Sequence, residues 1–215
     1  MKTFFLSLFA ILGFSAHAQD DLVDPGKVAV YFKVGGNSSN HIQWDDNEPT
    51  DPLIGPAGGM GIWIQLSKSH KFMRSLSLEG NFSGQGFQLE VNDVKNKVRT
   101  AYFGASLSYR QYLGKFFLTA GGEHAWLMSA INVQGDQRED FPEGTYQKTT
   151  WNGIGGIGVN FGAPRSRQLD FGMELTYRQG LNSVRSDFVK ARQQVVTLSL
   201  FIPVSIVADM ASGLQ

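Results

Sequence analysis

Side chains that could do chemistry stand close together in one stretch of the sequence, where Glu123, His124 and Ser129 occur. A histidine can act as general base toward a serine hydroxyl while a carboxylate orients the imidazole, and such a set attacks esters. The three groups must then lie within hydrogen-bond reach of one another. In an extended chain neighbouring side chains point to opposite faces, so His124 points away from both Glu123 and Ser129. We therefore expect no catalytic residues here and an interfacial position for His124.

A second candidate is the acidic stretch WDDNEPTD, Trp44–Asp51, which could hold a divalent cation. It lacks the Asp-x-Asp/Asn-x-Asp/Asn-Gly spacing of a calcium loop. We expect no metal site and no cofactor, and we interpret the stretch as a solvent-exposed loop. Loops carried by a rigid scaffold are common binding sites, so a partner protein could bind here. The candidate binding residues are Asp45, Asp46, Glu48 and Asp51.

A third group of charged residues occurs inside segments that are otherwise apolar or small. Glu174 and Arg178, for example, belong to LDFGMELTYRQGL, Leu169–Leu181, in which apolar and polar residues alternate. Charges that are buried need partners of opposite sign. Basic and acidic residues both occur on the polar faces of these segments, so we predict an internal charge network. Its members are Lys33, Glu79, Arg110, Glu123, Glu174 and Arg178.

These residues must be positioned by β-strands, because the segments that hold them alternate with a period of two. Each segment has about the 9–11 residues that a tilted strand needs to cross a membrane. The sequence predicts eight strands, at Lys27–Gly36, Ala57–Leu66, Ser75–Phe82, Thr100–Leu113, Phe116–Met128, Asn152–Gly162, Leu169–Leu181 and Gln194–Pro203.

The connections between these segments differ in length in a regular way. Long connections are predicted at Asn37–Pro56, Asn132–Thr150 and Asn182–Gln193, and a medium one at Val91–Lys97. Short turns are predicted at Ser67–Met73, Gly114–Lys115 and Ala163–Gln168. Short turns on one side and longer loops on the other are typical of outer-membrane barrels.

The beginning of the sequence supports export. Lys2 precedes the apolar run Phe4–Phe14, and Ser15–Ala18 provides a small-x-small cleavage site, so residues 1–18 are predicted to be a signal peptide. We expect residues 19–215 to form a single barrel domain. The chain has no cysteine, which excludes disulfides and thiolate metal sites. Its 19 basic and 19 acidic residues balance, so no nucleic-acid partner is expected.

The polar faces decide which side of the barrel is outside. Besides the charges they carry many glycines and serines, which suit the narrow interior of an eight-stranded barrel but have no purpose on a soluble surface. We therefore predict an all-β fold, an eight-stranded antiparallel up-and-down transmembrane β-barrel with a filled lumen. The residues predicted to face lipid are Val30, Phe32, Ile62, Ile64, Leu76, Leu78, Phe103, Leu107, Leu118, Val159, Phe171, Met173, Leu175, Leu198 and Leu200.

Aromatic residues are frequent near the predicted strand ends, as in the interfacial girdles of membrane barrels. The predicted girdle residues are Tyr109, Tyr112, Phe116, Phe117, Trp126, Trp151 and Tyr177.

Three stretches carry a resemblance to a known family. AYFGASLSYRQYLGKFFLTAGGEHAWLMSA (101–130), WNGIGGIGVNFG (151–162) and ELTYRQGLNSV (174–184) are similar to the PorT-type, or porin-family, outer-membrane β-barrel proteins of the Bacteroidota. Together with the alternating loop lengths, the resemblance leads us to expect a place in the outer membrane of a diderm bacterium, with both termini periplasmic. It also implies an accessory role in an envelope process, such as type IX secretion.

From these patterns we expect a monomeric, non-enzymatic barrel with a structural, adhesive or accessory role and little or no conductance. Its expected partners are outer-membrane lipids and lipopolysaccharide, together with a periplasmic or extracellular protein. Two alternatives belong to other classes. One is a secreted lipocalin-like barrel that binds a small apolar ligand, and the other is a lipid-modifying enzyme built around His124.

Overall fold

The computed structural model describes residues 28–42, 51–68, 73–91, 94–134, 137–161, 171–185 and 192–207. The predicted signal peptide, residues 1–18, lies outside the described residues. Among the described residues, no helix is long and apolar enough to span a membrane. The strands are β1 (Val28–Ile42), β2 (Asp51–Lys68), β3 (Met73–Val91), β4 (Val94–Leu113), β5 (Phe116–Gln134), β6 (Gln137–Asp140), β7 (Thr149–Asn160), β8 (Gly172–Gly180) and β9 (Arg192–Val207).

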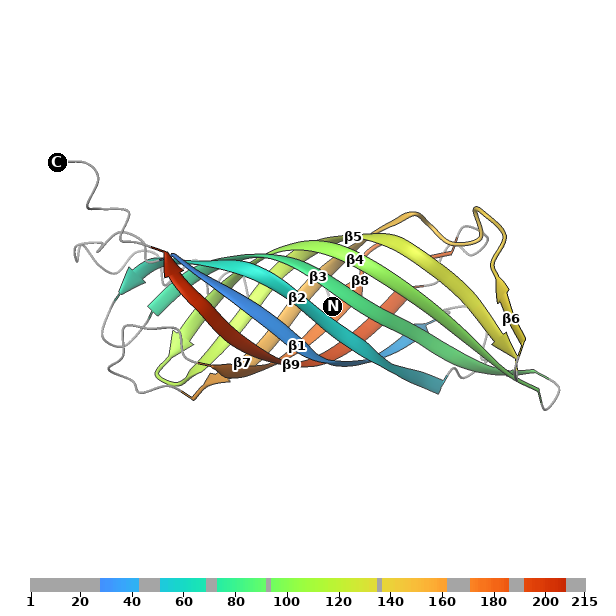
Figure 1. Ribbon diagram of the computed structural model, residues 1–215, viewed down its shortest axis with the longest axis horizontal. Helices are drawn as coiled ribbons and strands as arrows, with labels where there is room; N and C mark the ends of the chain where they lie inside the picture. The colour runs from blue at the N-terminus through green and yellow to red at the C-terminus, as the bar shows by residue number, and fades with distance from the viewer. Residues whose placement is uncertain are drawn as a thin grey trace, which may run out of the picture.

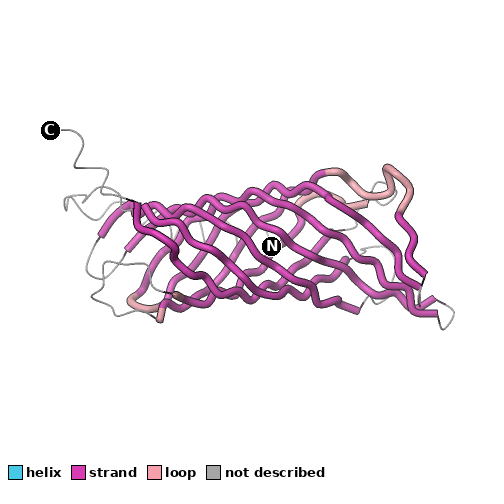
Figure 2. The backbone as a smooth tube through the Cα atoms, in the orientation of Figure 1, coloured by secondary structure: helices cyan, strands magenta, loops and turns pink. Residues whose placement is uncertain are grey.

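Eight of these strands close into an antiparallel barrel (Figure 1). Each pairs with its neighbours in the order β1-β2-β3-β4-β5-β7-β8-β9, and β9 pairs with β1 from Val28↔Val207 to Ile42↔Arg192. The short β6 pairs only with the far end of β5. Figure 2 shows the strands running obliquely around the barrel. The predicted fold, an eight-stranded antiparallel barrel, is confirmed.

The strands are longer than the alternating segments predicted, so several loop boundaries were wrong. β1 extends to Ile42 and β2 begins at Asp51, inside the predicted Asn37–Pro56 loop. The predicted medium loop at Val91–Lys97 is mostly strand, because β3 and β4 are separated only by residues 92–93. A strand ends where its ladder of hydrogen bonds ends, and polar residues can continue that ladder beyond the apolar band. Loss of apolar alternation therefore marked the limit of the apolar band and not the end of the strand.

The two ends of the barrel differ. The turn end holds Gly114–Lys115, which joins β4 to β5 with Gly114 at a φ of 67°, a left-handed conformation that glycine adopts without strain. The antiparallel order also places the start of β1 and the finish of β9 at this end. The opposite end, here called the loop end, holds the connection from β6 to β7 and the segment after β8.

Along each strand, burial alternates with the pleat. In β8, Glu174, Thr176 and Arg178 are buried inside the barrel, whereas Leu175 and Tyr177 are exposed outside. All fifteen residues predicted to face lipid lie on the outer parity. Eleven are exposed, and four are half-buried between neighbours: Val30, Leu76, Val159 and Met173. The barrel therefore presents an apolar outer band around a largely polar interior.

Candidate functional site

The centre of the lumen holds a cluster of two cations and two carboxylates from four strands. Lys33 of β1 places its Nζ 2.8 Å from Glu79 Oε2 and 2.7 Å from Glu174 Oε2. Arg110 of β4 places its Nη2 2.9 Å from Glu79 Oε1 and 3.1 Å from Glu174 Oε2. Each cation thus contacts both carboxylates. We call Lys33, Glu79, Arg110 and Glu174 the four-residue cluster.

The other two residues of the predicted network form a separate pair nearby. Arg178 Nε lies 3.3 Å from Glu123 Oε2, and its Nη1 donates to Thr197 Oγ1 at 2.8 Å. The Asn152 side chain donates to Glu123 Oε1 at 2.9 Å. Asn81 Nδ2, 3.5 Å from Glu123 Oε2, also contacts this pair. The structure therefore places the six charges in two groups, with equal numbers of each sign.

Neutral side chains also donate hydrogen bonds to the carboxylates of the four-residue cluster. Thr119 Oγ1 donates to Glu174 Oε1 at 2.6 Å, and the Tyr31 hydroxyl donates to Glu79 Oε1. The Arg110 side chain is fully buried, and Glu174 nearly so. Burying an ion is unfavourable unless partners replace the water it loses. Opposite charges and donors replace it here, so the cluster both fills the lumen and ties β1, β3, β4, β5 and β8 together.

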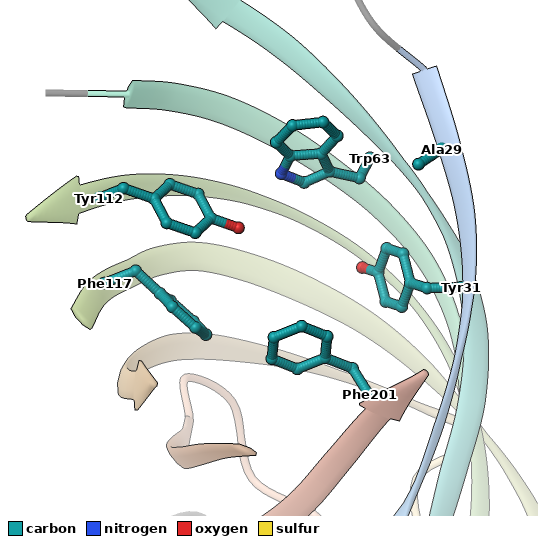
Figure 3. Packing of buried hydrophobic residues seen from close by; sticks show 6 residues of the cluster. All are labelled: Ala29, Tyr31, Trp63, Tyr112, Phe117 and Phe201. Carbon is teal, nitrogen blue, oxygen red and sulfur yellow. The ribbon is translucent and has the colours of Figure 1, made fainter. Parts of the chain in front are cut away.

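An aromatic plug closes the lumen at the turn end. It consists of Tyr31, Trp63, Tyr112, Phe117 and Phe201, which pack with Ala29 (Figure 3). The ring centroids of Tyr112 and Phe117 lie 5.2 Å apart, and those of Phe117 and Phe201 lie 5.8 Å apart. The Arg110 guanidinium carbon lies 5.4 Å from the ring centres of Tyr31 and Phe117, within cation–π range. The plug therefore joins directly to the four-residue cluster.

The plug corrects one prediction, because Tyr112 and Phe117 are inside the barrel and not in an outer girdle. The other five predicted girdle residues point outward. Space for the plug comes from glycines on the neighbouring strands, which pair directly with Phe117 and Phe201. A Cβ on Gly158 would lie 2.1 Å from Phe117 Cζ, and one on Gly172 would lie 2.2 Å from Phe201 Cζ. Large aromatics on the polar parity, opposite glycines of the same parity, are the signal from which the plug could have been found.

Toward the loop end the lumen is filled by neutral polar side chains. Asn37 Nδ2 and Gln85 Nε2 each donate to Ser83 Oγ at 2.8 Å, and Gln193 donates to Gln85. Near Lys33 and Arg178 a small cavity of about 10 Å³ remains, which is space for a single water molecule. This layer separates the charges from the loop end.

At the loop end an apolar cluster, here called the cap, lies on the inner face of the barrel wall. Phe87 and Val98 point inward from β3 and β4 and pack against Tyr146, which belongs to the connection between β6 and β7. Backbone hydrogen bonds hold this connection in place, from Gln147 N to Val184 O at 2.9 Å and from Leu127 N to Lys148 O at 2.9 Å. Among the described residues, the lumen therefore holds aromatic side chains at the turn end and polar side chains along its length, and the cap lies at the loop end.

His124 lies on the outer face, where aromatic side chains hold its ring. The imidazole stacks on Trp151 at a centroid distance of 4.4 Å and meets Trp126 edge-on at 4.6 Å. Glu123 points into the lumen, as its parity predicts, and is occupied by Arg178 and Asn152.

The prediction that Ser129 lies on the opposite face from His124 was wrong. A β-bulge shifts the register of β5 at Leu127–Ser129, so Ser129 is exposed on the same outer face as His124. Their β4 partners, Ala101 and Ala105, are four residues apart, which corresponds to about 13 Å along the strand. Ser129 is thus far beyond hydrogen-bond reach of His124.

The predicted acidic binding site is only partly described. Asp45, Asp46 and Glu48 lie outside the described residues. Asp51 is exposed, but it is the first residue of β2 and not a loop residue as predicted. Within the described ranges, no group of three or more His, Asp or Glu side chains is arranged to hold a metal ion.

Comparisons with known proteins agree with this architecture. The family described as "Outer membrane protein beta-barrel domain" matches residues 17–186. No curated protein sequence matches the chain. Among solved structures, neisserial surface protein A (NspA) is similar with a TM-score of 0.51 and 9% identity, over 82% of this chain and 99% of that one.

Two further solved structures are more distant. Ail, the attachment invasion locus protein of Yersinia pestis, has 12% identity over 84% of this chain and 99% of its own, with a TM-score of 0.42. The outer membrane protein OprG of Pseudomonas aeruginosa has 12% identity over 85% and 97%, with a TM-score of 0.36. At these identities, the likeness to NspA supports the barrel fold alone.

Proposed function

Because the chain belongs to the outer membrane protein β-barrel domain family, we propose that it acts in the outer membrane as a non-catalytic protein that conducts no solute and contacts other molecules through its loop end. The observation that carries this proposal is the lumen, which is filled by the plug at the turn end and by paired charges next to it. A barrel built in this way offers a stable frame for surface contacts, so a structural or adhesive role follows.

Planar-bilayer recording tests the closed lumen. The refolded protein should insert without producing a steady current, because no continuous path crosses the plug, the charge clusters and the cap. Insertion is verified separately by gel electrophoresis, since an intact membrane barrel migrates differently before and after boiling. A stable ohmic current from protein that shows the gel shift would contradict the proposal.

The proposed orientation places both termini and the turn end in the periplasm and the loop end outside the cell. Because the chain has no cysteine, single cysteines can report this. Glu143→Cys in the loop-end connection should react with a membrane-impermeant maleimide on intact cells. Lys115→Cys in the β4–β5 turn should react only after the outer membrane is opened. The reverse pattern would invert the orientation.

The geometry around His124 supports the non-catalytic part of the proposal, because neither Ser129 nor Glu123 can act on its imidazole. Substituting His124 by Ala should leave the lipid A profile of the cells unchanged, and an altered profile would favour a lipid-modifying enzyme.

The resemblance to PorT-type proteins adds an accessory role in type IX secretion as the more specific proposal. Loss of secreted proteins on deletion of the gene would support it, and normal secretion would contradict it.

A further inference from the structure

Part of the barrel wall projects beyond the rest at the loop end (Figure 1). Phe103 of β4 pairs with Trp126 of β5, and Trp126 pairs with Thr149, the first residue of β7. Beyond that point β5 pairs with β6 in place of β7, while β3 and β4 continue to Val91 and Val94. The projecting sheet is therefore formed by the ends of β3, β4 and β5 together with β6.

The outer face of the projecting sheet carries three cations. Arg99 pairs with Ile131, Lys97 pairs with Val133, and Val133 pairs with Arg138 of β6. Directly paired residues share a face, so these cations lie on the same side of the sheet as the exposed ring of Phe103, four residues from Arg99 on the same strand. We call Lys97, Arg99 and Arg138 the basic patch.

The neighbours of the basic patch leave it with a positive charge. Arg99 lies opposite Gly86, and Lys97 lies opposite Gln88, both of which are neutral. The structure describes the side chains at some of the outward positions of the projecting sheet. Among these, Asp140, opposite Ile131, is the one carboxylate. No ion pair joins any of the three cations to another described residue. Such a patch attracts phosphate groups.

Directly below the basic patch lies an aromatic surface. The rings of Phe103 and Trp126 stack with centroids 6.2 Å apart, and the side chain of Met128 is 67% exposed. His124 and Trp151 continue the surface onto β7. Trp and His side chains combine an apolar body with a polar edge and favour the boundary between acyl chains and headgroups. We therefore place the membrane boundary at this level.

The height of the cations decides which lipid fits. Arg99 and Lys97 precede Phe103 on β4 by four and six residues, toward the loop end. For a strand tilted by about 40°, these separations correspond to about 10 and 15 Å along the membrane normal. The headgroup layer on each side of a bilayer is only about 5–8 Å thick. A simple phospholipid phosphate therefore stays below the cations. A glycolipid whose phosphates are attached to sugars reaches them.

We propose that the outer face of β4, β5 and β6 binds a phosphorylated glycolipid of the outer leaflet, that is, lipopolysaccharide. The basic patch binds its phosphates, and the surface of Phe103, Trp126 and Met128 lies against its acyl chains. Charge complementarity and continuity with the lipid-facing band identify the occupant. The inference rests on the proposed orientation, which brings the loop end to the glycolipid-containing leaflet.

The test compares lipid retention by purified protein in mild detergent, measured by native mass spectrometry. The probes are purified lipopolysaccharide, the same glycolipid after removal of its phosphates, and phosphatidylglycerol. The variant is the triple substitution Lys97→Gln, Arg99→Gln and Arg138→Gln. Its control is Arg192→Gln, which removes an exposed cation from β9, on a part of the wall without the basic patch. The gel shift on boiling verifies that each variant is folded.

The triple variant should bind lipopolysaccharide about 100-fold more weakly, since each cation near an anionic surface contributes close to a factor of five. Arg192→Gln should bind like the wild type, and dephosphorylation of the glycolipid should weaken wild-type binding to a similar extent. Unchanged binding by the triple variant would overturn the proposal, as would equal loss in Arg192→Gln. Equal patch-dependent retention of phosphatidylglycerol would overturn the assignment to a glycolipid.

The cysteine labelling described above separates this inference from the proposed function. If Glu143→Cys is labelled only after the outer membrane is opened, the orientation fails and the glycolipid site fails with it. If the orientation holds and the triple variant still binds normally, the site alone is wrong.

Discussion

The Arg110 guanidinium lies 3.1 Å from the Glu174 carboxylate, although β4 and β8 are separated in the barrel wall by β5 and β7. The contact therefore crosses the lumen and does not follow the sheet. It belongs to a cluster in which two cations and two carboxylates share their partners, so no member can be removed without leaving a buried charge with less compensation.

Arg110→Met tests the importance of this cluster for stability. The variant leaves Glu79 and Glu174 with Lys33 as their one remaining cation in the cluster, and we expect a loss of about 3–5 kcal/mol in the free energy of unfolding. Urea titration in lipid vesicles, followed by the gel shift, measures it. Lys148→Gln is the control, because its partner Glu143 and Lys148 itself are both exposed, and surface pairs contribute little. A similar loss in the control would show that the cluster is not special.

Two glycines of β7 provide a matched pair for the plug. A Cβ at Gly158 would collide with the ring of Phe117, whereas one at Gly155 would have no atom within 4 Å. Gly158→Ala should destabilise the barrel by about 1–3 kcal/mol, because the ring must move in a packed lumen. Gly155→Ala should be neutral or slightly stabilising, because it lowers the entropy of the unfolded chain. Thermal unfolding of the two variants, measured side by side, tests this difference in stability. Equal unfolding temperatures would mean that the Phe117 ring can move without loss of stability.

Opening the plug alone should not open the barrel. The double variant Phe117→Ala, Phe201→Ala removes two rings at the turn end, but the four-residue cluster and the cap remain in place. Single-channel recordings should therefore show no steady current for this variant. A steady current would place the barrier to ions in the plug alone. The gel shift again distinguishes a folded closed barrel from an unfolded one.

Tyr146 should hold the loop-end cap closed. Its ring is buried against Phe87, Val98 and Phe141, so Tyr146→Ala leaves a space that the connection between β6 and β7 has to bridge. We expect this connection to be cut by protease at least several-fold faster while the strands stay intact. Glu143→Ala, an exposed change in the same connection, should leave the cleavage rate unaltered. Equal rates for Tyr146→Ala and the wild type would mean that the cap is held by its backbone hydrogen bonds.

Strand ends could not be read from the sequence with the same accuracy as strand faces. At Val91–Lys97 the apolar alternation stops, and the sequence predicted a loop, yet β3 and β4 pair almost to their tips. Backbone hydrogen bonds between strands form whether the side chains contact lipid or water. The face of Ser129 could not be predicted either. A bulge changes the face of every residue beyond it, and the alternation of residue types gives no sign of this bulge.

The sequence by itself determined the fold and the side that most strand residues take, except beyond the bulge in β5. The side chains of a strand alternate with a period of two, so one run such as Gly172–Gly180 assigns Leu175 outward and Glu174 inward. Only the tertiary structure decided which inward residues meet. Lys33, Glu79, Arg110 and Glu174 become neighbours because β9 closes onto β1 with a particular register. That register follows from strand tilt and packing around the whole barrel. For the same reason Tyr112, Phe117 and Phe201 form a plug only once the barrel is closed.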